Sequence, residues 1–424
     1  MAFGQEEVER RRQQREELRE KRAQEQQILK NKLTFAGAAL AVAAVIILVV
    51  VLLGNSAGQD PTATTQATIS TAVKETAPLG DTSVVHFAAA GDLNITDKVV
   101  ASGGVGMDYT QMIGDVLPLL AEADLTVMNF EGNVVGPPYG STYASAPAQL
   151  LTSLAIAGVD MLQMANSRSI SNGIIGLSTT LNAIRAAGME PLGAYATNSE
   201  FTDNGGYTIW QVQGVRIAVV AFTKGMDNMA LPAGSEKCVN LLYTDYSSTY
   251  VEVNTEGITD ILERVSKEKP DVTIALVHWG SEFNDTHSTS QLKIRDLLLE
   301  NGVDAILGTH PHYVQEVEFN RDNGTVVAYS LGDFISDRER AGTEYGIILD
   351  LEITKDNKTG TAKITNCTYS PIFTCQEEDG QLRVVRIQPA IDAYDCQYLD
   401  RVSTEDYNSM KNALNRIADR VTPD

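Results

Sequence analysis

Short apolar runs alternate with amphipathic, helix-like segments from Ser83 onward. This alternation is typical of strands with helices packed on a sheet. Several of the runs are apolar throughout, as expected for strands that are buried on both faces. The pattern predicts strands at 83–90, 125–130, 159–166, 215–222, 272–279, 304–309 and 325–331.

Helical periodicity separates several of these strands and changes character near the C-terminus. Helices are predicted at 177–188, 258–268 and 288–302, and the first and last of them end in glycine, a common helix terminator. After Leu349 the pattern becomes more antiparallel. It predicts strands at 349–354, 361–371 and 381–387 and an amphipathic helix at 403–421. We therefore expect an α/β domain over residues 83–400 and a C-terminal helix within 401–424.

The longest uncharged run, residues 33–53, predicts a transmembrane helix. Its 21 residues would span about 31 Å, enough for a hydrocarbon core. A cleaved signal peptide is the alternative, but such peptides have a shorter apolar stretch and a short basic lead. Arg22, Lys30 and Lys32 precede the run and no basic residue follows it closely. The positive-inside rule therefore predicts a single-pass protein of the cell membrane, with a cytoplasmic N-terminus and an extracytoplasmic main domain.

The two segments beside this run have distinct compositions. Residues 1–32 are rich in helix formers, with Glu and Arg three and four positions apart, and predict a charged cytoplasmic helix. Residues 54–82 consist largely of Thr, Ala, Ser, Gln and Pro, a composition that buries too little apolar surface to fold. We expect this second segment to be a disordered stalk.

The net charge of −22 over 424 residues lies almost entirely after residue 32. Such an acidic domain argues against nucleic acid or an anionic membrane surface as its main partner, because phosphate binding needs an excess of Lys and Arg. All four cysteines follow the apolar run, so disulfides could form in an oxidising compartment. Buried free thiols are the alternative, since the spacing fits no zinc site. The cysteines are Cys238, Cys367, Cys375 and Cys396.

Polar side chains of the types that bind metals follow most of the predicted strands. Each has an ordinary structural explanation by itself, such as helix capping by Asp92 or a structural role for His278. Because the carboxyl ends of strands form the ligand crevice of α/β sheets, these side chains can nevertheless converge. Carboxylates, an amide and several imidazoles together suit a pair of divalent ions such as Mn, Fe or Zn. The candidate metal ligands are Asp92, Glu131, Asn166, His278, His310 and His312.

Several segments resemble the capsule biosynthesis family of CapA, the poly-γ-glutamate synthesis family, whose domain is similar to calcineurin-like metallophosphoesterases. The resemblance runs from about residue 85 to 336 and is carried by AAAGDLN, MNFEG, LVHWGSEF, GVDAILGTHPHYVQEVEF and VVAYSLGDF. It implies a two-sheet sandwich flanked by helices, with a metal site at one edge. It also implies one ion held by Asp92, Glu131 and His312, and a second held by Glu131, Asn166, His278 and His310, with Glu131 bridging.

The chain departs from the family pattern at several positions, of which Arg168 and Asp333 change the chemistry of the site most directly. Arg168 stands where a histidine is common; Arg does not donate a proton near neutral pH, but it can clamp a phosphate or carboxylate. Asp333 stands where Asn is usual, and it could form an ion pair with Arg168. Candidate catalytic residues are therefore His278, Arg168 and Asp333, and a groove around Arg168, Lys224 and Arg338 could bind an anionic polymer.

Three functions fit these observations. The first is a membrane-anchored, metal-dependent hydrolase or transferase-like enzyme that acts on a phosphoester or a γ-glutamyl polymer during capsule or poly-γ-glutamate biosynthesis or export. The second is a non-catalytic scaffold subunit that binds the anionic polymer, poly-γ-glutamate, within a membrane synthesis complex. The third is a cell-surface interaction domain that has kept only the fold.

Overall fold

The computed structural model describes residues 71–73, 80–397 and 402–421. The chain divides into two compact units, and the one described below comprises residues 68–391 and 401–424. The predicted cytoplasmic helix and transmembrane span lie outside the described residues. Among the residues that are described, no helix is both long and apolar enough to cross a membrane. Of the predicted stalk, the structure describes only a short strand, Thr71–Val73, and the last residues before Ser83.

One of the two sheets has seven strands, and the third to the sixth of them in spatial order pair in parallel. The apolar runs predicted as strands at 215–222, 272–279, 304–309 and 325–331 form these four. In spatial order the strands are β1 (Thr71–Val73), β6 (Tyr207–Val212), β7 (Val215–Thr223), β8 (Val272–His278), β9 (Ala305–Thr309), β11 (Thr325–Ala328) and β10 (Val317–Asn320).

The second sheet has eight strands and is parallel on one side and antiparallel on the other. In spatial order it contains β15 (Leu382–Arg386), β14 (Ala362–Gln376), β13 (Tyr345–Asp356), β2 (Thr82–Asn94), β3 (Leu125–Glu131), β4 (Met161–Gln163) and β5 (Glu190–Leu192). A short strand, β12 (Asp333–Ile335), pairs in parallel with the end of β2. The shift to antiparallel pairing after Leu349 is as predicted.

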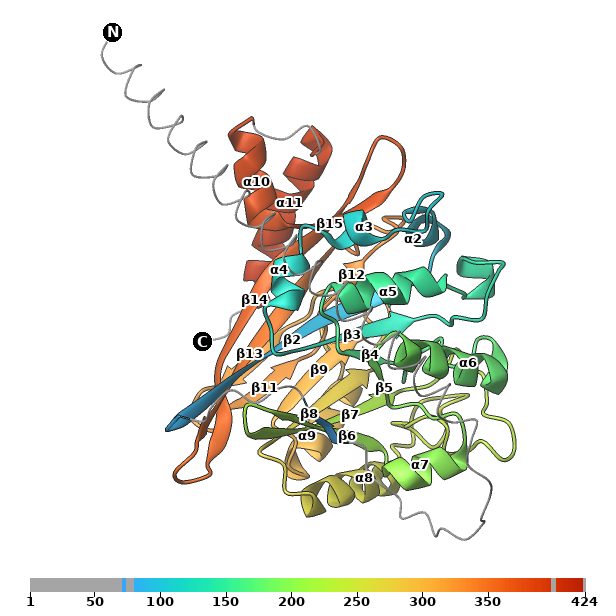
Figure 1. Cartoon of the computed structure of the whole chain (residues 1–424), viewed down its shortest axis with the longest axis vertical. Coiled ribbons are helices and arrows are strands. Elements are labelled where there is room, and N and C mark those ends of the chain that lie inside the picture. Colours follow the sequence, from blue (N-terminus) through green and yellow to red (C-terminus); the bar gives the residue numbers. More distant parts are fainter. Residues whose placement is uncertain (1–70, 74–79, 398–401, 422–424) are drawn as a thin grey trace, which may run out of the picture. The chain divides into compact units, whose positions relative to one another are not determined.

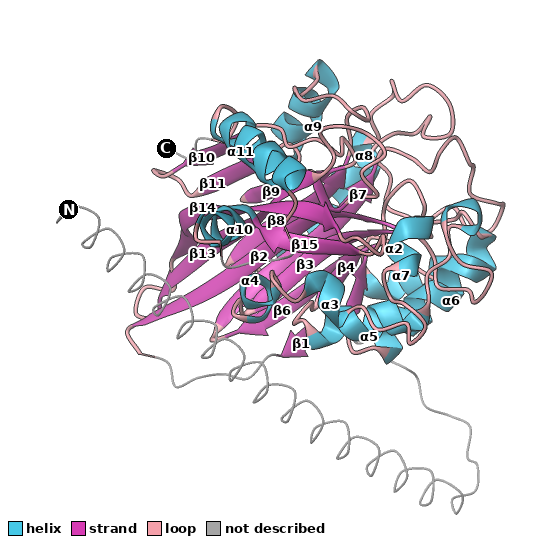
Figure 2. Cartoon of the chain, turned by 90° about the horizontal axis from the view of Figure 1, so that it is seen from above, coloured by secondary structure: helices cyan, strands magenta, loops and turns pink. Residues whose placement is uncertain are grey.

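The two sheets lie against each other, with β2 near β9 and β5 near β7 (Figures 1 and 2). Helices α8 (Thr255–Lys267) and α9 (Thr289–Glu300) pack on the seven-stranded sheet through an apolar cluster that includes Phe222, Ile261 and Leu298. On the other sheet, α6 (Gly173–Ala186) lies by β5 and α11 (Thr404–Ala418) by β14. The predicted two-sheet α/β fold flanked by helices is confirmed.

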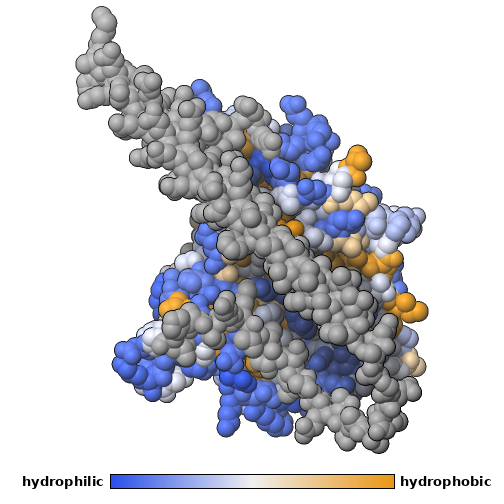
Figure 3. Space-filling view, in the orientation of Figure 1, coloured by the Kyte–Doolittle hydropathy of each residue, from blue (hydrophilic) through white to orange (hydrophobic). Residues whose placement is uncertain are grey.

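The remaining helices are short. They are α2 (Asp97–Ala101), α3 (Thr110–Ile113), α4 (Leu117–Ala121), α5 (Ala148–Ile156), α7 (Asn198–Asn204) and α10 (Ile387–Asp395), with a 3-10 turn at Ser141–Tyr143. The described surface visible in Figure 3 is mostly hydrophilic, with scattered apolar residues. All four cysteines are free thiols, and Cys238, Cys367 and Cys375 are buried. The structure therefore favours the free-thiol alternative over disulfides.

Strand β4 ends at Gln163, three residues before the end of the predicted strand. The hydroxyl of Ser169 donates to the carbonyl of Met164 (2.5 Å) and accepts from the backbone N–H of Asn166 (3.0 Å). These bonds turn the chain out of the sheet directly after the strand. Asn166 therefore lies in a turn rather than in a ladder.

A glycine allows β2 and β12 to approach closely. The backbone N–H of Asp92 donates to the carbonyl of Gly332 (3.0 Å), and Asp92 lies opposite Asp333 in the register. A Cβ atom on Gly91 would lie only 1.8 Å from that carbonyl oxygen. The absence of a side chain at Gly91 therefore lets two carboxylate-bearing strand ends lie side by side.

We expect Gly91→Ala to destabilise the domain by about 3 kcal/mol, because the added methyl forces β2 and β12 apart. Chemical denaturation of the purified protein would measure this. Gly106→Ala is the matched control, since nothing lies within 4 Å of a Cβ atom built there. Equal stabilities for the two variants would show that the close approach is not needed.

Candidate metal centre

Five of the six side chains predicted as metal ligands come together where strand ends of the two sheets meet. Asp92 and Glu131 end strands of the eight-stranded sheet, whereas His278, His310 and His312 end or follow strands of the other sheet. These five residues, and also Asn166 and Asp333, are each at most 7% exposed. The predicted convergence of residues distant in sequence is thus present in the fold.

Among the residues that the structure describes, three groups of side chains could each hold a metal ion, and the ligand atoms within a group all lie within 4.8 Å of one another. Asp92 and His312 each belong to two groups. The resemblance implied Glu131 as the bridging ligand; here Glu131 joins one group. The groups are Asp92 with Glu131 and His278, Asp92 with His312 and Asp333, and Glu282 with His310 and His312.

Asn129, which the sequence analysis did not select, holds the two central carboxylates. Its side-chain amide donates to Asp92 Oδ1 (2.5 Å) and to Glu131 Oε1 (3.0 Å), and its Nδ2 lies 3.4 Å from His278 Nδ1. Because alternate residues of a strand share a face, Asn129 lies on the same side of β3 as Glu131. The spacing of two residues between Asn129 and Glu131 was the sequence signal that could have identified Asn129.

Asn166 lies behind Asn129 rather than beside the histidines. Its Nδ2 donates to Asn129 Oδ1 (3.0 Å) and to the carbonyl of Phe130 (2.8 Å). Its own Oδ1 accepts from the backbone N–H of Arg168 (2.9 Å). In this arrangement Asn166 orients Asn129 and the following turn, and it belongs to none of the three ligand groups.

The HPH turn presents both of its imidazoles to the centre. His310 and His312 have positive φ angles of 91° and 59°, an uncommon backbone conformation for residues other than glycine. The backbone N–H of His310 donates to Asp92 Oδ2 (3.0 Å), which fixes the turn to the end of β2. The strained turn is therefore held by a central carboxylate.

Ser167 and Lys224 contact imidazoles of the centre. The hydroxyl of Ser167 lies 3.0 Å from His278 Nε2 and 3.4 Å from His310 Nδ1. Lys224 Nζ lies 3.3 Å from His310 Nε2 and donates to the carbonyl of Gly280 (2.8 Å). Lys224 thus faces the centre rather than a surface groove.

Arg168 and Asp333, which both depart from the family pattern, do not pair with each other. Arg168 Nη1 lies 2.9 Å from Asp227 Oδ2, while Asp333 Oδ1 lies 2.7 Å from His312 Nδ1. Asp333 is thereby part of a ligand group, and Arg168 stands beside the centre with a separate carboxylate.

Burial dominates the electrostatics of the centre. It raises the pKa of Asp92, raises that of Glu131 well above the usual value with help from Asp92, and raises that of Asp333 to about 7. Burial lowers the pKa of His278 and His310. For His312 burial acts the same way, but Asp333, Asp92 and Glu131 outweigh it and raise the pKa well above 6.5.

This distribution of charge suits a cation. Three buried carboxylates share one readily protonated imidazole, and two neutral imidazoles offer free lone pairs nearby. Buried carboxylates are stabilised by pairing or by coordinating a metal. The cluster is therefore compatible with a divalent metal site.

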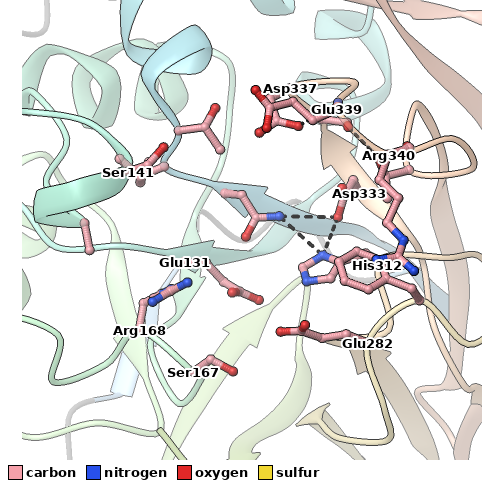
Figure 4. A pocket seen from close by; sticks show the side chains of 17 residues that line it. Glu131, Ser141, Ser167, Arg168, Glu282, His312, Asp333, Asp337, Glu339 and Arg340 are labelled. Carbon is pink, nitrogen blue, oxygen red and sulfur yellow. Dashed lines mark hydrogen bonds and ion pairs between the residues drawn. The ribbon is translucent and has the colours of Figure 1, made fainter. Parts of the chain in front are cut away.

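A cavity of about 360 Å³ leads to the centre from solvent. Glu131, His312 and Asp333 are among its inner lining, and Arg168, Glu282 and Arg340 among its outer lining. Figure 4 shows Arg168 and Arg340 on opposite sides of Glu131 and His312. Arg338, predicted to line the groove, instead extends to Asp406 of α11, with Nη1 2.6 Å from Oδ1.

Fold and centre together define a two-sheet α/β protein with a buried carboxylate and histidine cluster at its strand ends. Residues 86–338 match the family described as bacterial capsule synthesis protein PGA_cap. The chain belongs to this family, which confirms the resemblance drawn from the motifs.

Two curated relatives have related names. The chain is 26% identical over 267 residues to the capsule biosynthesis protein CapA of Bacillus anthracis, covering 60% of each chain. It is 25% identical over 262 residues to the PGA biosynthesis protein CapA of Bacillus subtilis, covering 59% of this chain and 63% of that one. The match thus spans less than two thirds of the relatives' own length.

Among solved structures, the calcineurin-like phosphoesterase YfkN from Bacillus subtilis matches with a TM-score of 0.41 and 16% identity. The match covers 80% of this chain and 97% of that one.

We expect the metal-free protein to lose stability as the pH rises above about 6.5. Asp333, whose pKa rises from 3.8 to about 7, and His312, whose pKa lies well above 6.5, bind more protons in the folded than in the unfolded chain. The stabilisation from Asp333 is lost from about pH 4 to just above pH 7, and that from His312 is lost from about pH 6.5 upward. His278 and His310, whose pKa values are lowered, act in the opposite direction only at lower pH. Thermal unfolding after chelation, from about pH 6.5 to about pH 8.5, measures this.

Asp333→Asn is the control, because the amide has no proton to lose. Its unfolding temperature should fall less steeply over that range. Added Mn²⁺ should raise the unfolding temperature of the unaltered protein more at the upper end, since ligands must be deprotonated to bind metal. Parallel pH curves for the protein and Asp333→Asn would contradict the assignment.

Proposed function

We propose that this protein is a membrane-anchored, extracytoplasmic hydrolase of capsule or poly-γ-glutamate biosynthesis that cleaves a phosphoester with two divalent ions. The observation that carries the proposal is the crowding of Asp92, Glu131 and Asp333 with three imidazoles at the inner end of a solvent-connected cavity. The family membership supports the biological setting, and the uncharged run at 33–53 supports the anchor.

The ligand groups indicate which residues would hold the ions. Asp92, Glu131 and His278 would hold one, and Asp92, His312 and Asp333 the other. Mn, Fe and Zn suit such mixed oxygen and nitrogen ligands. When bound, such a metal pair lowers the pKa of a water and stabilises the charge that develops on the phosphoryl oxygens.

The chain's own residues prepare the site for this chemistry. Asn129 holds the carboxylates of Asp92 and Glu131 in place through its amide. The hydrogen bond between Asp333 Oδ1 and His312 Nδ1 fixes that imidazole and can retain a proton between the two atoms. His278 is fully buried behind Ser167, which suits metal binding rather than direct proton transfer to a substrate.

Arg168 supplies a fixed positive charge at the cavity wall. Its pairing with Asp227 uses Nη1 and orients the guanidinium, whose other N–H groups can donate to a phosphoryl oxygen. Arg168→Ala should therefore weaken substrate binding.

A scaffold that binds an anionic polymer without cleaving it is the second candidate. The observation that favours it is Arg168 itself, because a guanidinium binds anions but does not donate a proton near neutral pH. The two candidates differ in turnover, since only the first requires hydrolysis.

Loss of a central ligand should abolish hydrolysis. We expect Asp92→Asn and His312→Ala each to reduce cleavage of bis(p-nitrophenyl) phosphate by about 100-fold or more, because changes even to groups behind the ligands cost 10- to 100-fold. Metal analysis of the same samples should show less than the full content. His86→Ala is the control, because His86 pairs with Asp350 outside the centre. Full metal content without turnover in the unaltered protein would favour the scaffold.

The proposed topology has its own test. Protease added to intact bacterial cells should degrade the domain, because it would lie outside the membrane. Deletion of residues 33–53 should keep the domain inside and protected. Protection of the full-length chain would contradict an extracytoplasmic domain.

A further inference from the structure

Arg340 lies on a platform that connects it to the centre. Its guanidinium carbon is 3.8 Å from the centroid of the Phe283 ring, and that ring stacks on His312 with centroids 5.4 Å apart. A cation over an aromatic face is attracted by the ring while its N–H edges stay free to donate. The stack thus fixes the position of Arg340 without using its hydrogen-bond donors.

The guanidinium of Arg340 has no carboxylate partner within the described residues, although acidic side chains are abundant in this chain and several line the same cavity. Arg168 pairs with Asp227, and Arg338 pairs with Asp406. Unlike them, Arg340 keeps its donors available at the mouth of the cavity.

The loop that carries Arg340 is held at several points. Ser336 and Thr343 bond through their hydroxyls (2.6 Å), and the Tyr313 hydroxyl donates to the carbonyl of Ala341 (2.8 Å). Two residues before Arg340, Arg338 forms an ion pair with the buried Asp406 of α11. A side chain on a loop fixed in this way loses little further freedom when it binds a ligand.

The opposite wall of the cavity carries Arg168 (Figure 4). Between the two arginines lie Glu131 and His312 of the candidate metal centre. A phosphoryl group at the centre would therefore have one guanidinium on each side. The cavity volume, about 360 Å³, is at the lower end for small-molecule sites, which favours a compact ligand.

We propose that Arg340, stacked on Phe283 and facing Arg168, binds a second anionic group of the substrate, a carboxylate or a further phosphate next to the scissile phosphoester. This inference rests on the proposed phosphoester hydrolysis for its substrate class. Arg340 lies beyond the family-matched residues 86–338. We assign to it the selection of phosphoesters that carry two anionic groups over phosphoesters that carry only one.

Paired substrates test the selection directly. 3-Phosphoglycerate and glycerol 3-phosphate differ by a carboxylate, and fructose 1,6-bisphosphate and fructose 6-phosphate differ by a phosphate. We expect kcat/KM for phosphate release by the metal-loaded protein to be at least tenfold higher, in at least one pair, for the compound with two anionic groups. The pair that shows the preference identifies the second group as carboxylate or phosphate.

Arg340→Gln should reduce that preference to near unity, and Arg340→Lys should retain part of it, because an ammonium keeps the charge but loses the planar, two-pronged donor. Arg321→Gln is the matched control. Arg321 also stacks on an aromatic ring, that of Phe319 at 5.2 Å, but is not part of the cavity lining. The control should keep the full preference.

Titration calorimetry with the same ligand pairs separates this inference from the proposed hydrolysis. One result would support the role of Arg340 and contradict the proposed hydrolysis. In it, no compound is cleaved, the ligand with two anionic groups binds at least tenfold more tightly than its partner, and Arg340→Gln removes that difference. If hydrolysis occurs with no preference in either pair, or with a preference that survives in Arg340→Gln, the assignment of Arg340 is overturned.

Discussion

The central constraint on this protein is the burial of three carboxylates and three imidazoles within a few ångströms of one another. Buried carboxylates need partners, because their charge is no longer stabilised by water. Here Asn129 and the backbone N–H of His310 supply hydrogen bonds to Asp92, and His312 shares a proton with Asp333. These contacts satisfy part of the negative charge, and the remainder makes the cluster suited to cations. The two sheets and their connecting turns are arranged so that this cluster can form.

The backbone around the cluster follows from the same constraint. β2 and β12 approach closely because Gly91 has no side chain, and this approach places Asp92 beside Asp333. The HPH turn adopts positive φ angles at both histidines, a conformation held by the bond from His310 to Asp92. Such locally unfavourable geometry persists where surrounding contacts determine it, and it is common at functional sites. The backbone that carries the candidate ligands is therefore fixed by contacts within the protein itself.

The cavity around the centre is lined by residues from inside and from outside the family-matched range. Residues 86–338, which match the PGA_cap family, contain the ligand groups and Arg168. Arg340 follows that region and is positioned by a loop whose neighbouring residue Arg338 is bound to the C-terminal helix α11. The centre thus comes from the shared part of the family domain, whereas part of the cavity wall is built with the help of the C-terminal region. This division is consistent with one chemistry adapted to a particular anionic ligand.

The sequence by itself determined most of the strands, the principal helices and the residue types of the centre, because hydrophobic period and strand-end position are local properties. It did not indicate β5, β6, β10 or β12. It placed Asp92, Glu131, His278 and the HPH turn at the right ends of the right strands. The tertiary structure decided which polar atoms meet. Asn129 as the support of two carboxylates, Asp227 as the partner of Arg168, and the different partners of Arg338 and Arg340 all depend on contacts between segments far apart in the chain. A side chain on a loop points toward whichever distant partner the fold brings within reach, and no local pattern encodes that choice.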